Sequence, residues 1–228
     1  MSSVELEYIE LLHNPIKTRD EMQQLERFRD EFVNELREEV SELLGDLRSV
    51  GVLCKGIWDL VNTKEPYPQA IPVLIRYLSN NFHYRNKEGI VRALAVKEAI
   101  GVAAPRLIEE YYRTPLDKDS YRSAIGNAVY VTFTSTDVEA ILQIVEDRKN
   151  GPSRFMFVAA LGRVKGDSDR IESILMKLLN EEDQLLEAAV RALGGIRSKK
   201  AKGLLLDLLP KTKSSRKKVI LEALKRIG

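Results

Sequence analysis

Apolar residues return at helical spacing through most of the chain. The apolar positions of one representative segment are Ile171, Ile174, Leu175, Leu178 and Leu179. Steps of three and four residues place these side chains on one face of a helix. The best candidate for a strand, residues 128–134, falls in phase with the helical pattern. The pattern therefore predicts an all-α fold.

A short motif built on an Ala-Leu or Ala-Val pair recurs along the chain. The pairs begin at Ala93, Ala128, Ala160, Ala192 and Ala223, with spacings of 35, 32, 32 and 31 residues. A second set of apolar positions has nearly the same period, at Ile75, Ile108, Leu142, Leu175 and Leu205. Such a period is typical of stacked two-helix units. The alanine allows neighbouring helices to approach closely.

An earlier segment, 51–78, fits the same pattern with an insertion. Gly56 and Ile57 replace the Ala-Leu pair, and the loop between the two helices lengthens around residues 66–68. Other residues mark helix ends. Asp183, Ser198, Thr136 and Asp137 are candidate caps, and Gly151-Pro152 and Gly194-Gly195 are expected to break the chain between helices.

Residues 188–209, AAVRALGGIRSKKAKGLLLDLL, carry a family resemblance. They resemble the HEAT-like repeat of the phycobilin-lyase type, in which an Ala- and Val-rich helix ending in RALGGI is followed by a turn and a Leu-rich helix. The resemblance covers roughly residues 49–228. It implies a right-handed α-α superhelix, a HEAT-like solenoid of about five helix pairs with N-terminal capping helices. It also implies that the second helix of each pair lines the concave side.

The two ends are predicted to cap the stack, because its last apolar faces need a polar cover. We expect one continuous domain with an N-terminal cap at 1–48, repeats at 49–212 and a C-terminal capping helix at 213–228. Thr18 and Glu21 match a capping box, and one amphipathic helix is expected to follow to about Arg48. Its apolar positions are Leu25, Phe28, Phe32, Leu36, Val40, Leu43 and Leu47. Their mean spacing of 3.67 favours a straight helix on a protein surface over a two-stranded coiled coil.

Charge changes this picture mainly at the ends. The 228 residues have a net charge of +2, but residues 1–50 hold 6 basic and 13 acidic side chains, whereas residues 196–228 hold 11 and 2. This asymmetry permits weak head-to-tail association. No run approaches the length of a membrane span and the N-terminus lacks the pattern of a signal peptide, so we expect a cytoplasmic protein with no membrane partner.

Residues with catalytic or metal-binding chemistry are few. Phosphate-binding glycine loops, nucleophile elbows and the HExxH zinc motif are absent from the sequence. His13 and His83 lack the neighbouring glutamate of the di-iron HEAT hydroxylases of the deoxyhypusine type. The single cysteine, Cys54, is interpreted as a packed thiol, and Trp58 as a core residue. We therefore expect a protein that is not an enzyme and has no metal or cofactor.

Tyrosines give the leading prediction for a binding surface, since seven of the eight fall between residues 67 and 130. Tyrosine is enriched at interfaces, although helix ends in large repeats also bury it. If the surface is functional, second-helix residues form a groove for a partner protein: Arg76, Tyr77, Glu109, Tyr112, Arg113, Gln143 and Lys177. The sequence thus favours a non-enzymatic scaffold, adaptor or immunity-type protein that binds a partner on its concave face.

Two alternatives stay open. Basic residues near the C-terminus could contact phosphates of a nucleic acid, with or without glycosylase-like chemistry: Lys199, Lys200, Lys213, Arg216, Lys217 and Lys218. Their lack of interleaved aromatic residues counts against single-strand binding. The resemblance also permits a lyase-like protein that acts on a tetrapyrrole or another cofactor.

Overall fold

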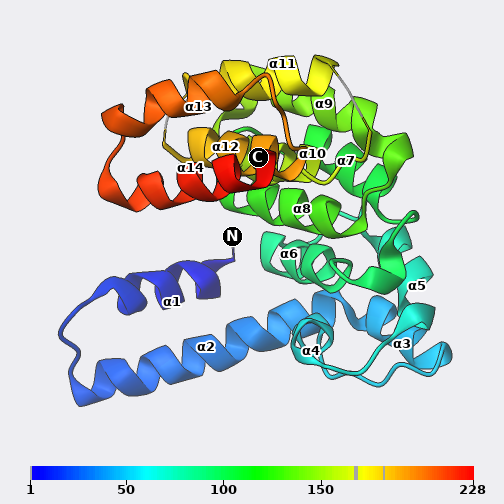
Figure 1. Cartoon of the computed structure of the whole chain (residues 1–228). Coiled ribbons are helices and arrows are strands. Elements are labelled where there is room, and N and C mark those ends of the chain that lie inside the picture. The colour runs from blue at the N-terminus through cyan, green and yellow to red at the C-terminus, as the bar shows by residue number, and fades with distance from the viewer. Residues whose placement is uncertain (1, 167–168, 182) are drawn as a thin grey trace. The chain divides into compact units, whose positions relative to one another are not determined.

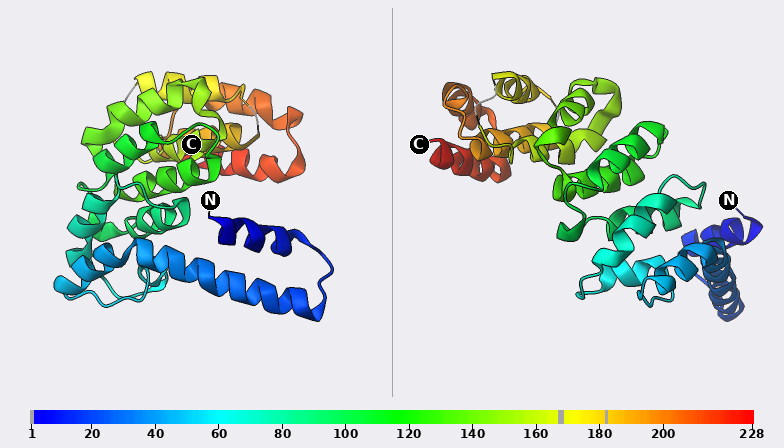
Figure 2. Two further views of the ribbon diagram at one scale, coloured as in Figure 1. Left: turned by 180° about the vertical axis from the view of Figure 1, so that it is seen from behind. Right: turned by 90° about the vertical axis from the view of Figure 1, so that its right-hand side faces the viewer.

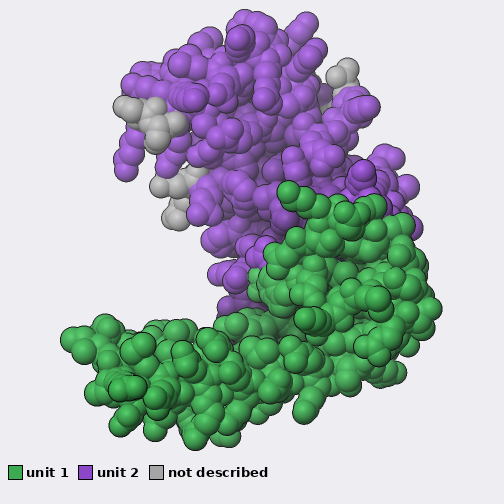
Figure 3. All heavy atoms as spheres, turned by 90° about the horizontal axis from the view of Figure 1, so that it is seen from below, with its two compact units in different colours: residues 1–90 green, residues 91–228 purple. Residues whose placement is uncertain are grey.

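The computed structural model describes residues 2–166, 169–181 and 183–228, apart from the side chains of residues 183, 214 and 215. Within these residues every regular element is a helix and none is a strand, which confirms the prediction of an all-α fold. The chain divides into two compact units, residues 1–90 and 91–228 (Figure 3). Each unit is built from helices that bury an apolar stripe against their neighbours.

In the described part of the N-terminal unit, residues 2–90, five complete α-helices are followed by the start of a sixth. These are α1 (Ser3–His13), α2 (Arg19–Glu39), α3 (Ser41–Ser49), α4 (Ile57–Asn62), α5 (Ile71–Tyr77) and α6 (Tyr84–Ala93), with the short 3-10 helix η1 (Pro68–Ala70) before α5. Helices α1 and α2 lie side by side and antiparallel (Figures 1 and 2). The predicted capping box is confirmed: Glu21 N–H donates to Thr18 Oγ1 (3.2 Å), and Thr18 N–H donates to the Glu21 carboxylate (2.7 Å).

The expected single helix to Arg48 is instead two helices that meet at Val40. Val40 has φ −102° and ψ 15°, outside the α-helical region. The break turns α3 so that it packs against α5, and it keeps Val40, Leu43 and Leu47 fully buried. The sequence did not reveal it because the apolar spacing continues unchanged across the break.

The C-terminal unit alternates two kinds of helix. We call α8 (Asp119–Thr132), α10 (Phe155–Leu161), α12 (Asp183–Gly195) and α14 (Ser214–Ile227) the first helices, since they carry the recurring alanine pairs. We call α7 (Ala104–Arg113), α9 (Val138–Glu146), α11 (Asp169–Leu178) and α13 (Lys202–Leu208) the second helices. Among the described residues, the 3-10 helix η2 (Lys97–Ala99) precedes α7, and η3 (Ser135–Asp137), η4 (Arg148–Arg154) and η5 (Leu209–Lys211) lie between the helices named above.

The helices of the C-terminal unit form two layers (Figure 1). Each first helix packs on the next, α8 on α10, α10 on α12 and α12 on α14, while each also packs on a second helix. Both sets of recurring apolar positions therefore lie on helices, as the period predicted. The stripe of α11 is buried in full, and Ile220, Ala223 and Ile227 bury one face of α14.

Small residues let the first helices approach very closely, and three glycines form the tightest points of this small-residue seam. A Cβ atom on Gly162 would lie 2.6 Å from Ala192 Cα, and one on Gly194 would lie 2.8 Å from Ala223 Cα. A Cβ on Gly195 would collide with the carbonyl of Gly162. Separations below 3.0 Å leave no room for a methyl group.

The prediction that Gly194 and Gly195 break the chain is wrong, because they are the last two residues of α12 and serve this seam. Gly151 does break the chain, with φ +55° inside η4. The Asp137 carboxylate accepts from the Thr134 N–H (2.7 Å) in a capping box at the start of η3, where Thr134 is the N-cap, and Asp137 takes the N-cap position of α9 without a side-chain cap. Ser198 Oγ accepts from the Ala201 N–H (3.3 Å) in the turn before α13, whose N-cap position is Ala201. Asp183 begins α12, but its side chain lies outside the described residues.

A buried arginine ties η4 to α7 and α8. The Arg122 guanidinium donates to the carbonyls of Tyr111 (3.0 Å) and Thr114 (2.8 Å) and to the Asn150 amide oxygen (2.5 Å). It also lies 3.8 Å from the centroid of the Tyr111 ring. Buried donors need such partners, because leaving them unpaired costs about 1–3 kcal/mol each. This network fixes the turn that leads into α10, which is one of the first helices.

Candidate functional site

The predicted partner groove divides between the two units. In the C-terminal unit, Glu109, Tyr112 and Arg113 lie on α7, Gln143 on α9 and Lys177 on α11, and all five are exposed. Tyr112 is 55% exposed, so its ring is available to a partner. These residues lie on successive second helices, as their spacing predicted.

Charges on the second helices are largely paired with one another. Arg106 pairs with Glu109 (2.9 Å) within α7, and Arg170 of α11 reaches Glu139 (2.9 Å) and Glu146 (2.8 Å) of α9. Lys200, before α13, pairs with Asp169 and with Glu172 of α11, and this hydrogen-bonded ammonium lowers the pKa of Asp169. This layer therefore presents many charges but little excess of either sign.

Arg76 and Tyr77 belong to the N-terminal unit. Tyr77 is only 5% exposed, and its hydroxyl donates to Asp46 Oδ2 (2.6 Å). That hydrogen bond, together with burial, raises the pKa of Tyr77 to about 12. Arg76 forms an ion pair with the same carboxylate. The Tyr77 ring is thus part of the core of its unit, which corrects its assignment to a partner groove.

Other tyrosines also divide between core and surface. Tyr67, Tyr111 and Tyr121 are buried, whereas Tyr84 and Tyr112 are exposed. The Tyr111 hydroxyl lies 2.7 Å from Ser153 Oγ, and burial raises the pKa of Tyr111. The clustering of tyrosines between residues 67 and 130 therefore arises more from packing in the core than from a shared exposed surface.

The basic residues near the C-terminus are mostly exposed. Lys199 lies in the turn before α13, Lys213 caps α14, and Lys217 and Lys218 lie in the first part of α14, all on the surface. Arg216 is half-buried, and Lys200 is held by the two carboxylates described above. The six residues are therefore not equally available for phosphate contacts.

The histidines have structural partners. His83 Nε2 lies 3.1 Å from Glu5 Oε1, and His13 Nδ1 lies 2.9 Å from the Ile9 carbonyl. Among the described residues, no three His, Cys, Asp or Glu side chains come together in a way that could hold a metal ion. The contact with Glu5 links His83 to α1.

Cys54 lies in the loop before α4, and Trp58 lies in the first turn of α4. Cys54 is half-buried, and burial, followed by the charge of Asp59, raises the pKa of its thiol. A raised pKa disfavours the thiolate that a nucleophile needs. Trp58 is 41% exposed, which corrects its assignment to the core. The core position in this turn is taken by Ile57, and the Trp58 ring lies over Gly89 at the surface.

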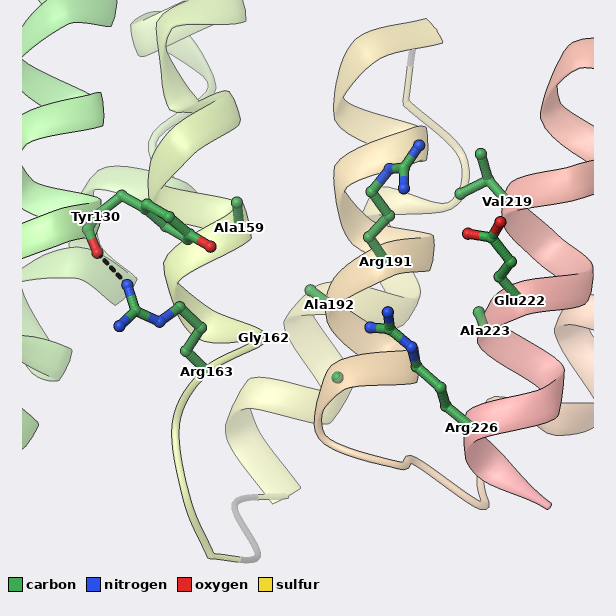
Figure 4. A pocket seen from close by; sticks show the side chains of 11 residues that line it. Tyr130, Ala159, Gly162, Arg163, Arg191, Ala192, Val219, Glu222, Ala223 and Arg226 are labelled. Carbon is green, nitrogen blue, oxygen red and sulfur yellow. Dashed lines mark hydrogen bonds between the residues drawn. The ribbon is translucent and has the colours of Figure 1, made fainter.

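The most distinctive surface feature is a pocket of about 240 Å³ on the first helices (Figure 4). We call it the arginine pocket, because three arginines line it. Arg163 follows the end of α10, Arg191 lies on α12 and Arg226 lies on α14. Its floor contains the residues of the small-residue seam. The remaining lining residues are Tyr130, Ala159, Gly162, Ala192, Gly195, Val219, Glu222 and Ala223.

Contacts hold two of the three arginines in place. Arg163 donates to the Tyr130 carbonyl (2.5 Å) and lies 4.7 Å from the Tyr130 ring centroid and 5.5 Å from that of Phe133. Arg191 donates to Glu187 Oε1 (2.8 Å), one turn earlier on α12. Arg226 and Glu222 form no ion pair within the part of the chain that the structure describes. Figure 4 shows Arg163 beside Tyr130 on one side of the pocket and Arg191 and Arg226 on the other.

Sequence reasoning missed this pocket although a signal for it exists. Arg163 and Arg226 each follow the alanine of their repeat by three residues, and Arg191 precedes its alanine by one. These two positions differ by four residues, so they lie on the same face of the first helices. Each arginine alone is typical of a solvated helix face, and only the repeat register brings them together.

Comparisons with protein-family models, curated proteins and solved structures find no match for this chain. Among the described residues, no helix combines the length and the apolar character that a membrane span requires.

Proposed function

We propose that the protein is a non-enzymatic binding module built from HEAT-like repeats stacked as a right-handed superhelix. Its partner is another protein, and an acidic segment of that partner lies across the first helices of the C-terminal unit. The observation that carries this proposal is the arginine pocket, where arginines from three successive repeats surround a floor of small residues.

The chemistry of the pocket suits recognition of an anion by its shape. Arginine presents a planar fork of donors that matches carboxylate and phosphate oxygens. Tyr130 and Glu187 hold Arg163 and Arg191 in the free protein, so a ligand has to exchange these hydrogen bonds for its own, while Arg226 has no ion pair among the described residues. The glycine and alanine floor allows the backbone of an extended segment to approach the helices closely.

The pocket favours the first helices over the second helices as the binding face, because three arginines line one hollow there. On the second helices, Arg106, Arg170 and Lys200 each have carboxylate partners, and binding an acidic partner there would break those pairs. Among the described residues, Arg226 on the first helices and Arg113 on the second helices have no carboxylate partner, whereas Arg191 is paired with Glu187. The exposed Tyr112 remains the strongest feature of the second-helix surface.

Affinity capture with the tagged protein tests the proposal. We expect a stoichiometric partner protein that is retained by the parent chain and lost from the variant Arg163→Glu with Arg226→Glu. The matched control, Arg113→Glu with Lys177→Glu, reverses two exposed charges on the second helices and should retain the partner. Loss from the control alone would contradict the proposal and would assign binding to the second-helix surface.

Nucleic acid is a second candidate partner, favoured by the exposure of Lys213, Lys217 and Lys218 around the start of α14. Contacts between lysines and phosphates release counterions, so such binding weakens steeply with salt. A gel shift at low salt with the parent protein, abolished by Lys217→Glu with Lys218→Glu, would support this candidate. The absence of any shift with the parent protein would remove it.

A further inference from the structure

We infer that the arginine pocket binds a phosphoryl group on a phosphorylated side chain of the partner protein. The inference rests on the proposed function and names the chemistry that the pocket recognises. It is carried by the charge and the geometry of the residues that line the pocket.

Charge is the first argument. The lining residues comprise three arginines and one glutamate, a formal charge of +2. A phosphoserine or phosphothreonine carries about −1.5 to −2 at neutral pH, which would neutralise that charge, whereas one carboxylate would neutralise only half of it. Glu187 lies outside the lining and offsets part of the charge of Arg191.

Geometry is the second argument. A phosphoryl group has three terminal oxygens arranged as a tripod, and arginines from different sides can each donate to a different oxygen. Arg163 lines the pocket from the side of α10 with its guanidinium turned toward Tyr130, and Arg191 and Arg226 line it from α12 and α14 (Figure 4). Arg163 has to exchange its hydrogen bond to the Tyr130 carbonyl for one to the phosphoryl group that Arg226 contacts. A carboxylate has two oxygens in one plane, which a single arginine fork already satisfies. Three arginines around one small pocket therefore exceed what one carboxylate can use.

Glu222 adds a second element of recognition. It lines the same pocket and forms no ion pair with a described residue. The Glu222 carboxylate would repel a bare anion, but it can accept a hydrogen bond from the backbone N–H groups of a bound peptide. The pocket thus combines donors for a phosphoryl group with one acceptor for the peptide that carries it, a pairing that free phosphate cannot use.

The small-residue seam supplies the shape. A Cβ atom on Gly162 or on Gly195 would collide with the backbone of the neighbouring first helix, so the first helices can meet this closely only with glycine at both positions, which also line the pocket. The seam is required for packing, and its consequence at the surface is a hollow between the arginines.

Fluorescence anisotropy with the full-length protein tests the inference. The probes are three forms of one labelled, glutamate-rich decapeptide that carry serine, glutamate or phosphoserine at its centre. We expect the phosphoserine form to bind about tenfold more tightly than the glutamate form, because its extra oxygen and charge engage a further arginine. Arg163→Gln with Arg226→Gln should abolish that difference, whereas the matched control Arg106→Gln with Arg113→Gln should retain it.

Each outcome decides a specific point. Equal affinity for the glutamate and phosphoserine forms, with both lost in the pocket variant, would overturn the inference and leave the proposed function standing. Inorganic phosphate that binds as tightly as the phosphopeptide would overturn the assignment to a protein side chain. An unlabelled single-stranded oligonucleotide that displaces the phosphopeptide at lower concentration than the peptide itself would overturn it in favour of nucleic acid. Unchanged thermal melting of both variants shows that the differences arise in the pocket.

Discussion

At the scale of single residues, the arginines of the C-terminal unit divide by what surrounds their guanidinium groups. Arg122 is 2% exposed, and its donors are satisfied by two carbonyls and by Asn150. Arg163 and Arg191 are exposed but held by Tyr130 and Glu187. Arg226 is exposed and has no ion pair among the described residues. The same side chain thus stabilises the unit at one position and offers free donors at another.

Titration of the Tyr77 hydroxyl tests whether its side chain lies in the core. Because the folded state raises the pKa of Tyr77 from the ordinary value of 10 to about 12, the folded chain holds this proton more tightly than the unfolded chain. The stability that this provides is fully present below pH 10 and is lost as the pH rises from 10 to about 12. Stability measured by urea denaturation should fall over that range, and less so in Tyr77→Phe.

The Asp46→Asn variant tests the cause of that shift. The hydrogen bond to the Asp46 carboxylate is the largest contribution, so its removal should move the titration of Tyr77 down toward 10. The difference in tyrosinate absorbance between the parent chain and Tyr77→Phe reports this step. A titration that stays near 12 in Asp46→Asn would show that burial alone sets the pKa.

At the scale of elements, the small-residue seam holds the first helices together and shapes the surface above them. Gly162 faces Ala192, Gly194 faces Ala223, and Gly195 faces the backbone at Gly162, across helices α10, α12 and α14. Glycine within a helix costs about 0.5–1 kcal/mol relative to alanine. The packing energy gained where the helix backbones touch along the seam outweighs this cost.

Alanine substitution at two helical glycines tests the seam. Gly194→Ala should lower the free energy of unfolding by about 1–3 kcal/mol, because the new methyl group would lie 2.8 Å from Ala223 Cα. The matched control is Gly203→Ala in α13, where nothing lies within 4 Å and φ is not positive, and it should stabilise the protein by about 0.5–1 kcal/mol. Urea denaturation measures both. Equal effects at the two positions would show that helix propensity, and not the seam, decides the outcome.

The sequence predicted the helices better than their ends or their surface. The two recurring sets, such as Ala192 and Leu205, lie on helices because burial of one face requires the periodic pattern. The break at Val40 was missed because apolar spacing does not record backbone direction. Gly194 and Gly195 were misjudged because a glycine pair has the same local signature in a turn and in a close helix contact.

The arginine pocket could be derived only by combining two periods, the repeat of about 32 residues and the helical turn. Arg163, Arg191 and Arg226 are 28 and 35 residues apart, so neither period alone brings them together. Tyr77 and Tyr112 show the converse: both fit a surface groove by spacing, yet the carboxylate of Asp46 holds one in the core while the other is exposed.

At the scale of the whole molecule, charge is distributed so that the pocket lies in the basic part of the sequence. Residues 1–50 hold 13 acidic side chains and residues 196–228 hold 11 basic ones, within a net charge of +2. Long-range attraction between an acidic partner and the C-terminal repeats is screened beyond about 8 Å at physiological salt. Affinity for an acidic segment should therefore depend on close contacts in the pocket, with the surrounding charge acting mainly on the rate of association.

The central claim is that the first helices of the C-terminal unit, and not the second helices, bind an acidic protein segment. NMR of the arginine Nε–Hε groups in the labelled full-length protein, titrated with the glutamate-rich decapeptide, tests it most directly. The account predicts that the signals of Arg163, Arg191 and Arg226 shift together with one dissociation constant, while those of Arg106 and Arg113 stay in place. Shifts confined to Arg106 and Arg113, with the three pocket signals unmoved, would contradict it.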